Sequence, residues 1–203
     1  EPYRRQRQMC IRDRINIPVS AEEQSQYING VTQINGYTEF EQPQVIENQD
    51  MAQLGYSDIR AYKIENAGEL AWFVQHFYAG DLETQNVSLA DNIDMSALAA
   101  YSWTPLGYYN VETQTGKSYD GVFDGNGYSI SNIILNQING VDLVSKVSEE
   151  QAAVLGTQPI ENIAQNALAG VFGYIGSAGH VTELKLENTS ITSNADAGVL
   201  TAV

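Results

Sequence analysis

The chain has 203 residues and a formal net charge of −15 at pH 7, enough length to bury one core and a small second unit. Five of its ten basic residues lie within residues 1–14, so the rest is strongly acidic and repels phosphate backbones and anionic lipid. Nucleic acid and membrane surfaces are therefore not expected partners. No apolar run is long enough to predict a membrane-spanning segment.

The segment at residues 1–14, "EPYRRQRQMCIRDR", differs in composition from everything after it. It is typical of translated sequencing-adapter sequence, and we expect it to be non-native; the alternative is a basic arm that binds polyanions. The single cysteine, Cys10, lies in it, so no internal disulfide is expected. A start at Glu1 and an end in mid-pattern at Val203 favour an internal fragment.

Residues 15–62 are polar and rich in glutamine, and we interpret them as a linker or the end of an upstream domain. Two Asn-Gly steps, at residues 29–30 and 35–36, lie between apolar residues in "YINGVTQINGYTEF". Asn-Gly favours tight hairpin turns, so short strands are expected here.

The sequence "NAGELAWFVQHFYAG" at residues 66–80 predicts an amphipathic helix. Asn66 is the expected N-cap and Glu69 takes the third helical position, as in a capping box. Gly80 supplies the stop. An apolar stripe at helical spacing is expected to face the core; it consists of Leu70, Phe73, Val74 and Phe77. A helix placed before a β-repeat can cover the first open layer of that repeat.

Residues 86–95, "NVSLADNIDM", predict a strand with four inward side chains: Val87, Leu89, Ile93 and Met95. In "SWTPLG", at residues 102–107, Trp103 is expected to pack and Pro105 to begin a turn. Residues 141–165 interrupt the pattern and predict a loop or short helix inserted between repeats.

The stretch at residues 119–136, "YDGVFDGNGYSISNIILN", predicts a turn at residues 124–127 followed by a β-branched strand. A shortened version returns at residues 170–191, where Gly-Val-Phe recurs and the spacing of Ile130, Ile133 and Leu135 is matched by Val181, Leu184 and Leu186. A third copy of this repeat begins at residues 197–200. Recurring turns and short strands are typical of a stacked β-repeat.

Neither histidine lies in a His-Glu-x-x-His pattern, so we interpret His76 and His180 as structural. No Gly-x-Ser-x-Gly pattern marks a nucleophile. Asp120 and Asp124 flank a turn and are the candidate carboxylate pair for glycosidase or lyase chemistry. Aspartates that bond their own turn explain both residues adequately, and we prefer that interpretation to catalysis.

Asp124 and Asn126, with Asp120 nearby, offer oxygen ligands for a weak calcium site, although an EF-hand pattern is absent. Glycines recur at every third position, at Gly170, Gly173, Gly176 and Gly179, and are interpreted as turns. Aromatic residues gather before the turn and are either a sugar-stacking platform or packing: Tyr101, Trp103, Tyr108, Tyr109 and Tyr119. We therefore expect no catalytic, cofactor-binding or metal residues.

From residue 64 onward the chain resembles bacterial cell-surface β-helix proteins with GLUG-type repeats, which include the N-terminal regions of IgA-specific metalloendopeptidases and gut-bacterial adhesin-like proteins. The matching pieces, in order, are "IENAGELAWFV", "VSLADNIDMS", "WTPLG", "GVFDGNGYSISNIIL" and "AGVFGYIGSAGHVTELKLENTSI". Val171 and Val199 stand where leucine is more usual. The resemblance implies an all-β fold, a right-handed parallel β-helix of the pectin-lyase-like kind, here a fragment with an N-terminal capping α-helix.

The expected domain organisation is a non-native segment at residues 1–14, a linker or upstream end at 15–62, and the start of a β-helix domain at 63–203. The expected function is a non-catalytic structural or binding module of a secreted or cell-surface adhesin-like protein. Its expected partner is a glycan or protein on a host or bacterial surface, with no cofactor. The alternatives are a non-catalytic region of a secreted metalloendopeptidase and a carbohydrate-active β-helix enzyme.

Overall fold

The computed structural model describes residues 29–34, 37–53, 55–80, 82–110, 114–141, 143, 169–194 and 197–200. This part of the chain is mostly strands with few helices, which confirms the predicted all-β character. The helical elements are α3 (Gln49–Gln53), α4 (Ala67–Ala79) and the 3-10 helix η2 (Met95–Leu98). The strands are β1 (Val31–Ile34), β2 (Tyr37–Phe40), β3 (Gln44–Glu47), β4 (Arg60–Ile64), β5 (Asn86–Leu89), β6 (Ile93–Asp94), β7 (Tyr108–Asn110), β8 (Thr115–Lys117), β9 (Val122–Asp124), β10 (Ser129–Ser131), β11 (Ile134–Asn136), β12 (His180–Thr182), β13 (Lys185–Glu187) and β14 (Ser190–Thr192).

The sheets are mixed in direction. The largest has the order β12-β9-β5-β4-β3, in which β3 is antiparallel to β4 and the other neighbours are parallel. A second sheet, β13-β10-β6, and a third, β11-β14, are parallel throughout. The pairs β1-β2 and β7-β8 are antiparallel hairpins. Within residues 63–203, where the resemblance implies parallel strands, β7 and β8 pair antiparallel.

Strands from distant parts of the chain lie one above another with apolar residues in register. Phe123 of β9 lies between Val87 and Val181 in the largest sheet. Ile130 of β10 lies between Ile93 and Leu186. Burial of these side chains supplies the main stabilising free energy of such short strands. The second and third sheets meet the first around one core, since Val87, Ile93, Phe123, Ile130 and Leu135 belong to the same buried cluster.

Strands β12, β13 and β14 pair parallel with β9, β10 and β11, but the register predicted from the sequence spacing is wrong. The partner of Ile130 is Leu186 and the partner of Leu135 is Ile191, whereas sequence spacing matched them to Val181 and Leu186. Val181 lies instead beside Phe123. Spacing of similar residues cannot fix which backbone groups pair, because a shift along the chain preserves the spacing and changes every partner.

The two Gly-Val-Phe segments occupy different places in the fold. Phe123 lies in β9, while Phe172 forms a parallel bridge with Leu106 of the "SWTPLG" segment. The segment at 169–172 in turn lies beside residues 197–200, since Phe172 N–H donates to Leu200 O at 2.8 Å. Close approach explains the glycines here: a Cβ on Gly173 would lie 2.3 Å from Gly107 O.

Residues in the left-handed backbone conformation form the bends between successive strands. Asn132, between β10 and β11, has φ 60°, and Asn188, between β13 and β14, has φ 50°. The predicted turn at residues 124–127 is present, with φ 49° at Asn126 and 77° at Gly127. Asparagine adopts this conformation at lower cost than most residues, so these positions bend the chain where the strands end.

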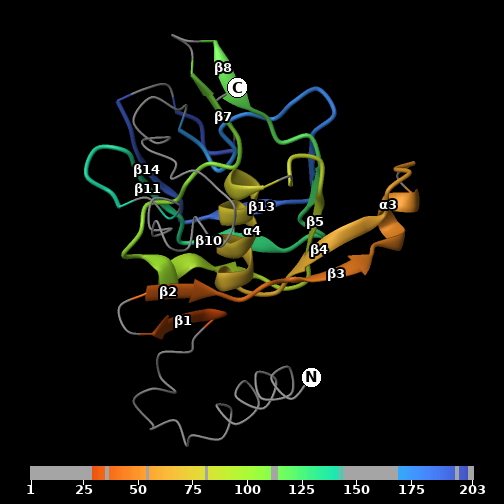
Figure 1. The fold of residues 1–203 in the computed structure, drawn as a ribbon, viewed down its shortest axis with the longest axis horizontal. Helices are drawn as coiled ribbons and strands as arrows, with labels where there is room; N and C mark the ends of the chain where they lie inside the picture. Colours follow the sequence, from red (N-terminus) through yellow and green to blue (C-terminus); the bar gives the residue numbers. More distant parts are fainter. Residues whose placement is uncertain are drawn as a thin grey trace, which may run out of the picture.

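Helix α4 confirms the predicted helix and its buried stripe. Asn66 Oδ1 accepts a hydrogen bond from Glu69 N–H at 2.9 Å, and Gly80 N–H donates to His76 O at 2.8 Å. The Glu69 carboxylate accepts from Glu65 N–H at 2.6 Å, one residue before the position a capping box uses. The stripe residues are all 0–1% exposed: Leu70, Phe73, Val74 and Phe77. In Figure 1, α4 lies between β5 on one side and β11 and β14 on the other.

Other predicted elements are found close to their expected places. Hairpin β1-β2 pairs Ile34 with Tyr37, as the Asn-Gly step at 35–36 predicts, although those two residues lie outside the described part. The predicted strand at 86–95 is divided into β5, β6 and the start of η2, and its four inward side chains are all buried. Strand β4 crosses the expected domain boundary at residue 62 and pairs with β5; the boundaries themselves remain a prediction.

Three predicted regions lie wholly or partly outside the described residues: the segment at 1–14 with Cys10, residues 15–28 of the expected linker, and nearly all of the insertion at 141–165. Of the insertion, Val141 and Leu143 are described and are 46% and 3% exposed. Among the described helices, none has the length and apolar character needed to cross a membrane.

Candidate functional site

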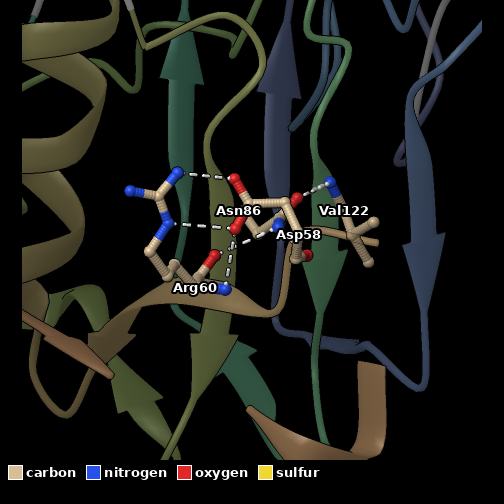
Figure 2. Close-up of polar contacts among 4 residues, drawn as sticks. All are labelled: Asp58, Arg60, Asn86 and Val122. Atoms are coloured by element: carbon tan, nitrogen blue, oxygen red, sulfur yellow. Dashed lines mark hydrogen bonds and ion pairs between the residues drawn. The ribbon is translucent and has the colours of Figure 1, made fainter. Parts of the chain in front are cut away.

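The side chain of Asn86, the first residue of β5, forms hydrogen bonds with the neighbouring strands β4 and β9. Its side chain is 7% exposed in a position that a β-branched residue would normally take. Its amide Nδ2 donates to Asp58 O at 2.9 Å and to Arg60 O at 3.0 Å, while Oδ1 accepts from Val122 N–H at 2.9 Å (Figure 2). One buried amide thus bonds backbone groups before β4, in β4 and in β9.

The Asp58–Arg60 pair borders this amide on the solvent side (Figure 2). Arg60 Nη2 lies 2.8 Å from Asp58 Oδ2, and Arg60 Nε donates to Oδ1 at 3.1 Å. These hydrogen bonds, with that from Arg60 N–H and the guanidinium charge, lower the pKa of Asp58 from 3.8 to about 2. The side chains are 66% and 52% exposed, for Arg60 and Asp58 respectively, so their contribution to stability is small.

Arg60→Ala is expected to raise the pKa of Asp58 from about 2 toward 3.8, because it removes the first cause of the shift. The folded-state pKa is depressed, so the stability this pair adds is present above pH 3.8 and is lost as the pH falls toward 2. NMR titration of the Asp58 carboxyl carbon measures the shift. Lys63→Ala, which removes the cation that pairs with Glu65, is the control and should leave the pKa of Asp58 unchanged.

Asn48, a second buried amide, lies between β3 and α3 and bonds side chains of β5 and β9. Asn48 Nδ2 lies 3.1 Å from Ser88 Oγ and 3.1 Å from Asp124 Oδ2. Asp124, only 4% exposed, also accepts from Asn126 N–H at 2.8 Å through Oδ1. This confirms that Asp124 bonds its own turn, and both of its carboxylate oxygens are held by protein donors.

Asp120 has partners of its own. Ser118 Oγ donates to its Oδ2 at 2.5 Å, and Ala178 N–H donates to its Oδ1 at 3.3 Å. The carboxylate thereby links the segment before β9 to the turn before β12. Asn126, the third ligand considered for calcium, uses its amide to donate to Leu89 O at 3.3 Å. Among the described residues, no group of three or more His, Cys, Asp or Glu side chains is placed to hold a metal ion.

The rings of both histidines contact aromatic side chains. The His76 ring stacks on Trp72 with centroids 3.7 Å apart, and its Nδ1 lies 2.9 Å from Trp72 O. Burial lowers the pKa of His76 below its ordinary value of 6.5, so the neutral ring is favoured. The exposed His180 lies 5.7 Å from Tyr56, centroid to centroid.

The five aromatic residues considered as a sugar-stacking platform do not form one surface. Tyr119 is fully buried, with its hydroxyl donating to Gln85 O at 3.0 Å, and burial raises its pKa. Trp103 is 5% exposed and donates from Nε1 to Val171 O at 3.0 Å. Tyr101 bonds Thr38 at 2.7 Å. Only Tyr108 and Tyr109 of this group lie on the hairpin β7-β8.

Sequence reasoning missed Asn86 and Asn48, whose buried side chains form hydrogen bonds with other strands. The available signal was an asparagine immediately before the apolar run of β5, since buried amides need partners. It also missed Tyr174, whose ring lies 5.4 Å from that of Tyr109, because these residues are far apart in the chain. Both rings are half-buried and so keep part of their surface open.

Comparison with known proteins identifies no family. No family model matches the chain, and no solved structure matches it. A curated protein named halomucin, from Haloquadratum walsbyi (strain DSM 16790 / HBSQ001), is 29% identical over 112 residues. That match covers 55% of this chain and 1% of halomucin. The chain is thus similar to a very small part of a very long protein.

Proposed function

We propose that this chain is a non-catalytic structural or binding module of a secreted or cell-surface adhesin-like protein. The proposed scaffold is a right-handed parallel β-helix of the pectin-lyase-like kind, with α4 covering its first layer. One observation carries the proposal: in three separate sheets, β12, β13 and β14 pair parallel with β9, β10 and β11, in the same order along the chain. Such repetition is what a chain coiling through successive layers produces.

The arrangement of polar groups supports a role in scaffolding. Asn48, Asn86 and Asp124 each bond groups of neighbouring strands, and Asp120 bonds the turn before β12. The similarity to a short stretch of the long protein halomucin is also consistent with a module that forms one part of a larger protein. The secreted or cell-surface location is proposed on the same grounds, together with the acidic net charge of −15.

The expected partner is a surface glycan or protein, and the Tyr109–Tyr174 pair is the proposed contact for a sugar ring. Half-buried tyrosines with open ring faces stack on apolar sugar faces while their hydroxyls bond to water or ligand. A glycan array probed with the purified chain tests this. Tyr109→Ala should reduce glycan binding at least several-fold, whereas Tyr56→Ala, which removes a half-buried tyrosine elsewhere, should not.

A parallel assay on acidic polysaccharides separates this proposal from a carbohydrate-active enzyme. No new reducing ends or unsaturated products are expected. Turnover that is lost in Asp120→Asn or Asp124→Asn would overturn the non-catalytic proposal. Circular dichroism of each variant establishes that the strands are retained. A metalloendopeptidase context would be revealed by a His-Glu-x-x-His motif elsewhere in a longer gene product.

A further inference from the structure

The rings of Tyr109 and Tyr174 are inclined to each other and do not form a flat platform. Their centroids lie 5.4 Å apart and their planes are tilted by 58°. Neighbouring residues of a strand point to opposite faces, and Tyr108 approaches Tyr78 of α4, with ring centroids 6.1 Å apart. Tyr109 therefore faces away from α4. Its cross-strand neighbour on β8 is Gly116, which has no side chain to cover the ring.

Backbone contacts fix the position of Tyr174 relative to the hairpin β7-β8. Tyr174 O accepts from Tyr119 N–H at 3.0 Å, and Gly173 N–H donates to Leu106 O at 2.9 Å. Gly107, which immediately precedes β7, lies so close that an added Cβ would be 2.3 Å from Tyr174 O. The two rings are thus carried by backbone segments that contact each other. A ligand that binds between preorganised rings loses less affinity to their ordering.

Every lysine and arginine that the structure describes already has a partner. Arg60 pairs with Asp58, Lys63 with Glu65 and Lys117 with Glu83, each at 2.8 Å, and Lys185 Nζ donates to Gly127 O at 2.8 Å. Lys117 lies on β8, but it is opposite Tyr108 and so on the other face of the hairpin from Tyr109. None of these cations is left to pair with a carboxylate bound at the two rings.

A carboxylate of the protein lies beside the segment that carries Tyr174. An added Cβ on Gly176, two residues further along, would lie 2.2 Å from Asp120 Oδ1. The whole chain has a net charge of −15, so its field repels anions. An uncharged ligand does not experience this repulsion, whereas a ligand carboxylate is repelled without a compensating ion pair.

We infer that the Tyr109–Tyr174 pair selects an uncharged hexose ring and rejects sugars that carry a carboxylate, such as uronic and sialic acids. This inference rests on the proposed binding of a surface glycan and names its chemical class. The apolar C–H face of the hexose stacks on one tyrosine ring, and the tilted second ring contacts the edge of the sugar. The sugar hydroxyls then remain in water.

The selectivity is tested by isothermal titration calorimetry of the full chain with matched probes. The neutral probes are β-linked tetramers of glucose and of galactose, and the acidic probes are the same tetramers with each primary alcohol oxidised to a carboxylate. At about 0.02 M salt we expect the acidic probes to bind about tenfold more weakly, or worse. At about 0.5 M salt the difference should shrink, because the repulsion is screened, and the affinity for the neutral probes should stay the same.

Variants at Tyr174 link the binding to the ring pair. Tyr174→Ala should weaken binding of the neutral tetramers several-fold, whereas Tyr174→Phe, which keeps the ring, should retain most of the affinity. Acidic probes that bind as tightly as the neutral ones, or array hits confined to carboxylated glycans, would overturn the selectivity and leave glycan binding in place. No binding of any probe, together with an array without hits, would overturn the proposed glycan partner and this inference with it.

Discussion

Replacing Ile130 by alanine is expected to lower the free energy of unfolding by about 2–5 kcal/mol, the range for truncating a fully buried aliphatic side chain. Ile130 is 0% exposed and lies between Ile93 and Leu186 in the central strand of a three-stranded sheet. Removing its outer carbons leaves a cavity between strands whose backbone bonds hold them at fixed spacing, so the neighbours cannot collapse into it. Urea denaturation followed by circular dichroism measures the change.

Ile134→Ala is the matched control, because it removes the same atoms four residues along the chain. Ile134 is 40% exposed and lies on β11. We expect a loss of less than about 1 kcal/mol, since a partly solvated isoleucine creates no closed cavity. Similar losses for the two variants would contradict the placement of Ile130 inside the core.

The second large effect is expected at Asn86. In Asn86→Ala the Val122 N–H loses its acceptor, and Asp58 O and Arg60 O lose their shared donor. Because an unsatisfied buried group costs about 1–3 kcal/mol, we expect a loss of about 2–4 kcal/mol in unfolding free energy. Asn139→Ala, at an exposed turn position, is the control and should change stability by no more than about 0.5 kcal/mol.

Asn86→Asp tests whether the stability depends on the donor group Nδ2 of the amide or on its acceptor Oδ1. The aspartate keeps an acceptor for Val122 N–H but turns a second oxygen toward two carbonyl oxygens, so its ionised form is disfavoured in the folded state. Its folded-state pKa should therefore lie above the ordinary value, and the destabilisation should be largest at neutral pH and shrink as the pH falls below that pKa. A variant as stable as the natural chain at pH 7 would contradict the donor role.

Helix α4 is an element that could be predicted from neighbouring residues in the sequence. Asn66, Glu69 and the apolar stripe lie within a few residues of one another, and each acts through bonds or packing with its own turn or its own face. Such features can be predicted because they do not depend on the rest of the chain. Only the position of the Glu69 bond, one residue earlier than expected, was decided by the surrounding structure.

The pairing of the repeated segments could not be predicted from neighbouring residues in the sequence. Gly-Val-Phe recurs in the sequence, yet Phe123 lies beside Val181 while Phe172 lies beside Leu106. Which strands pair depends on the lengths of the connections and on the fit of the core, and neither follows from resemblance between two short segments. The five aromatic residues gathered before residue 120 were separated for the same reason: Trp103 and Tyr119 fill the core, while Tyr109 meets Tyr174.

By itself, the sequence determined the strand-rich character, the helix with its buried face, the inward residues of β5 and β6, and the left-handed turn at Asn126 and Gly127, because each is set by neighbours along the chain. The tertiary structure alone decided the register of the parallel sheets and the partners of Asn86 and Asp124. It also decided that β12, β13 and β14 pair in order with β9, β10 and β11. These depend on hydrogen bonds and packing between residues tens of positions apart, which form only when the whole chain has folded.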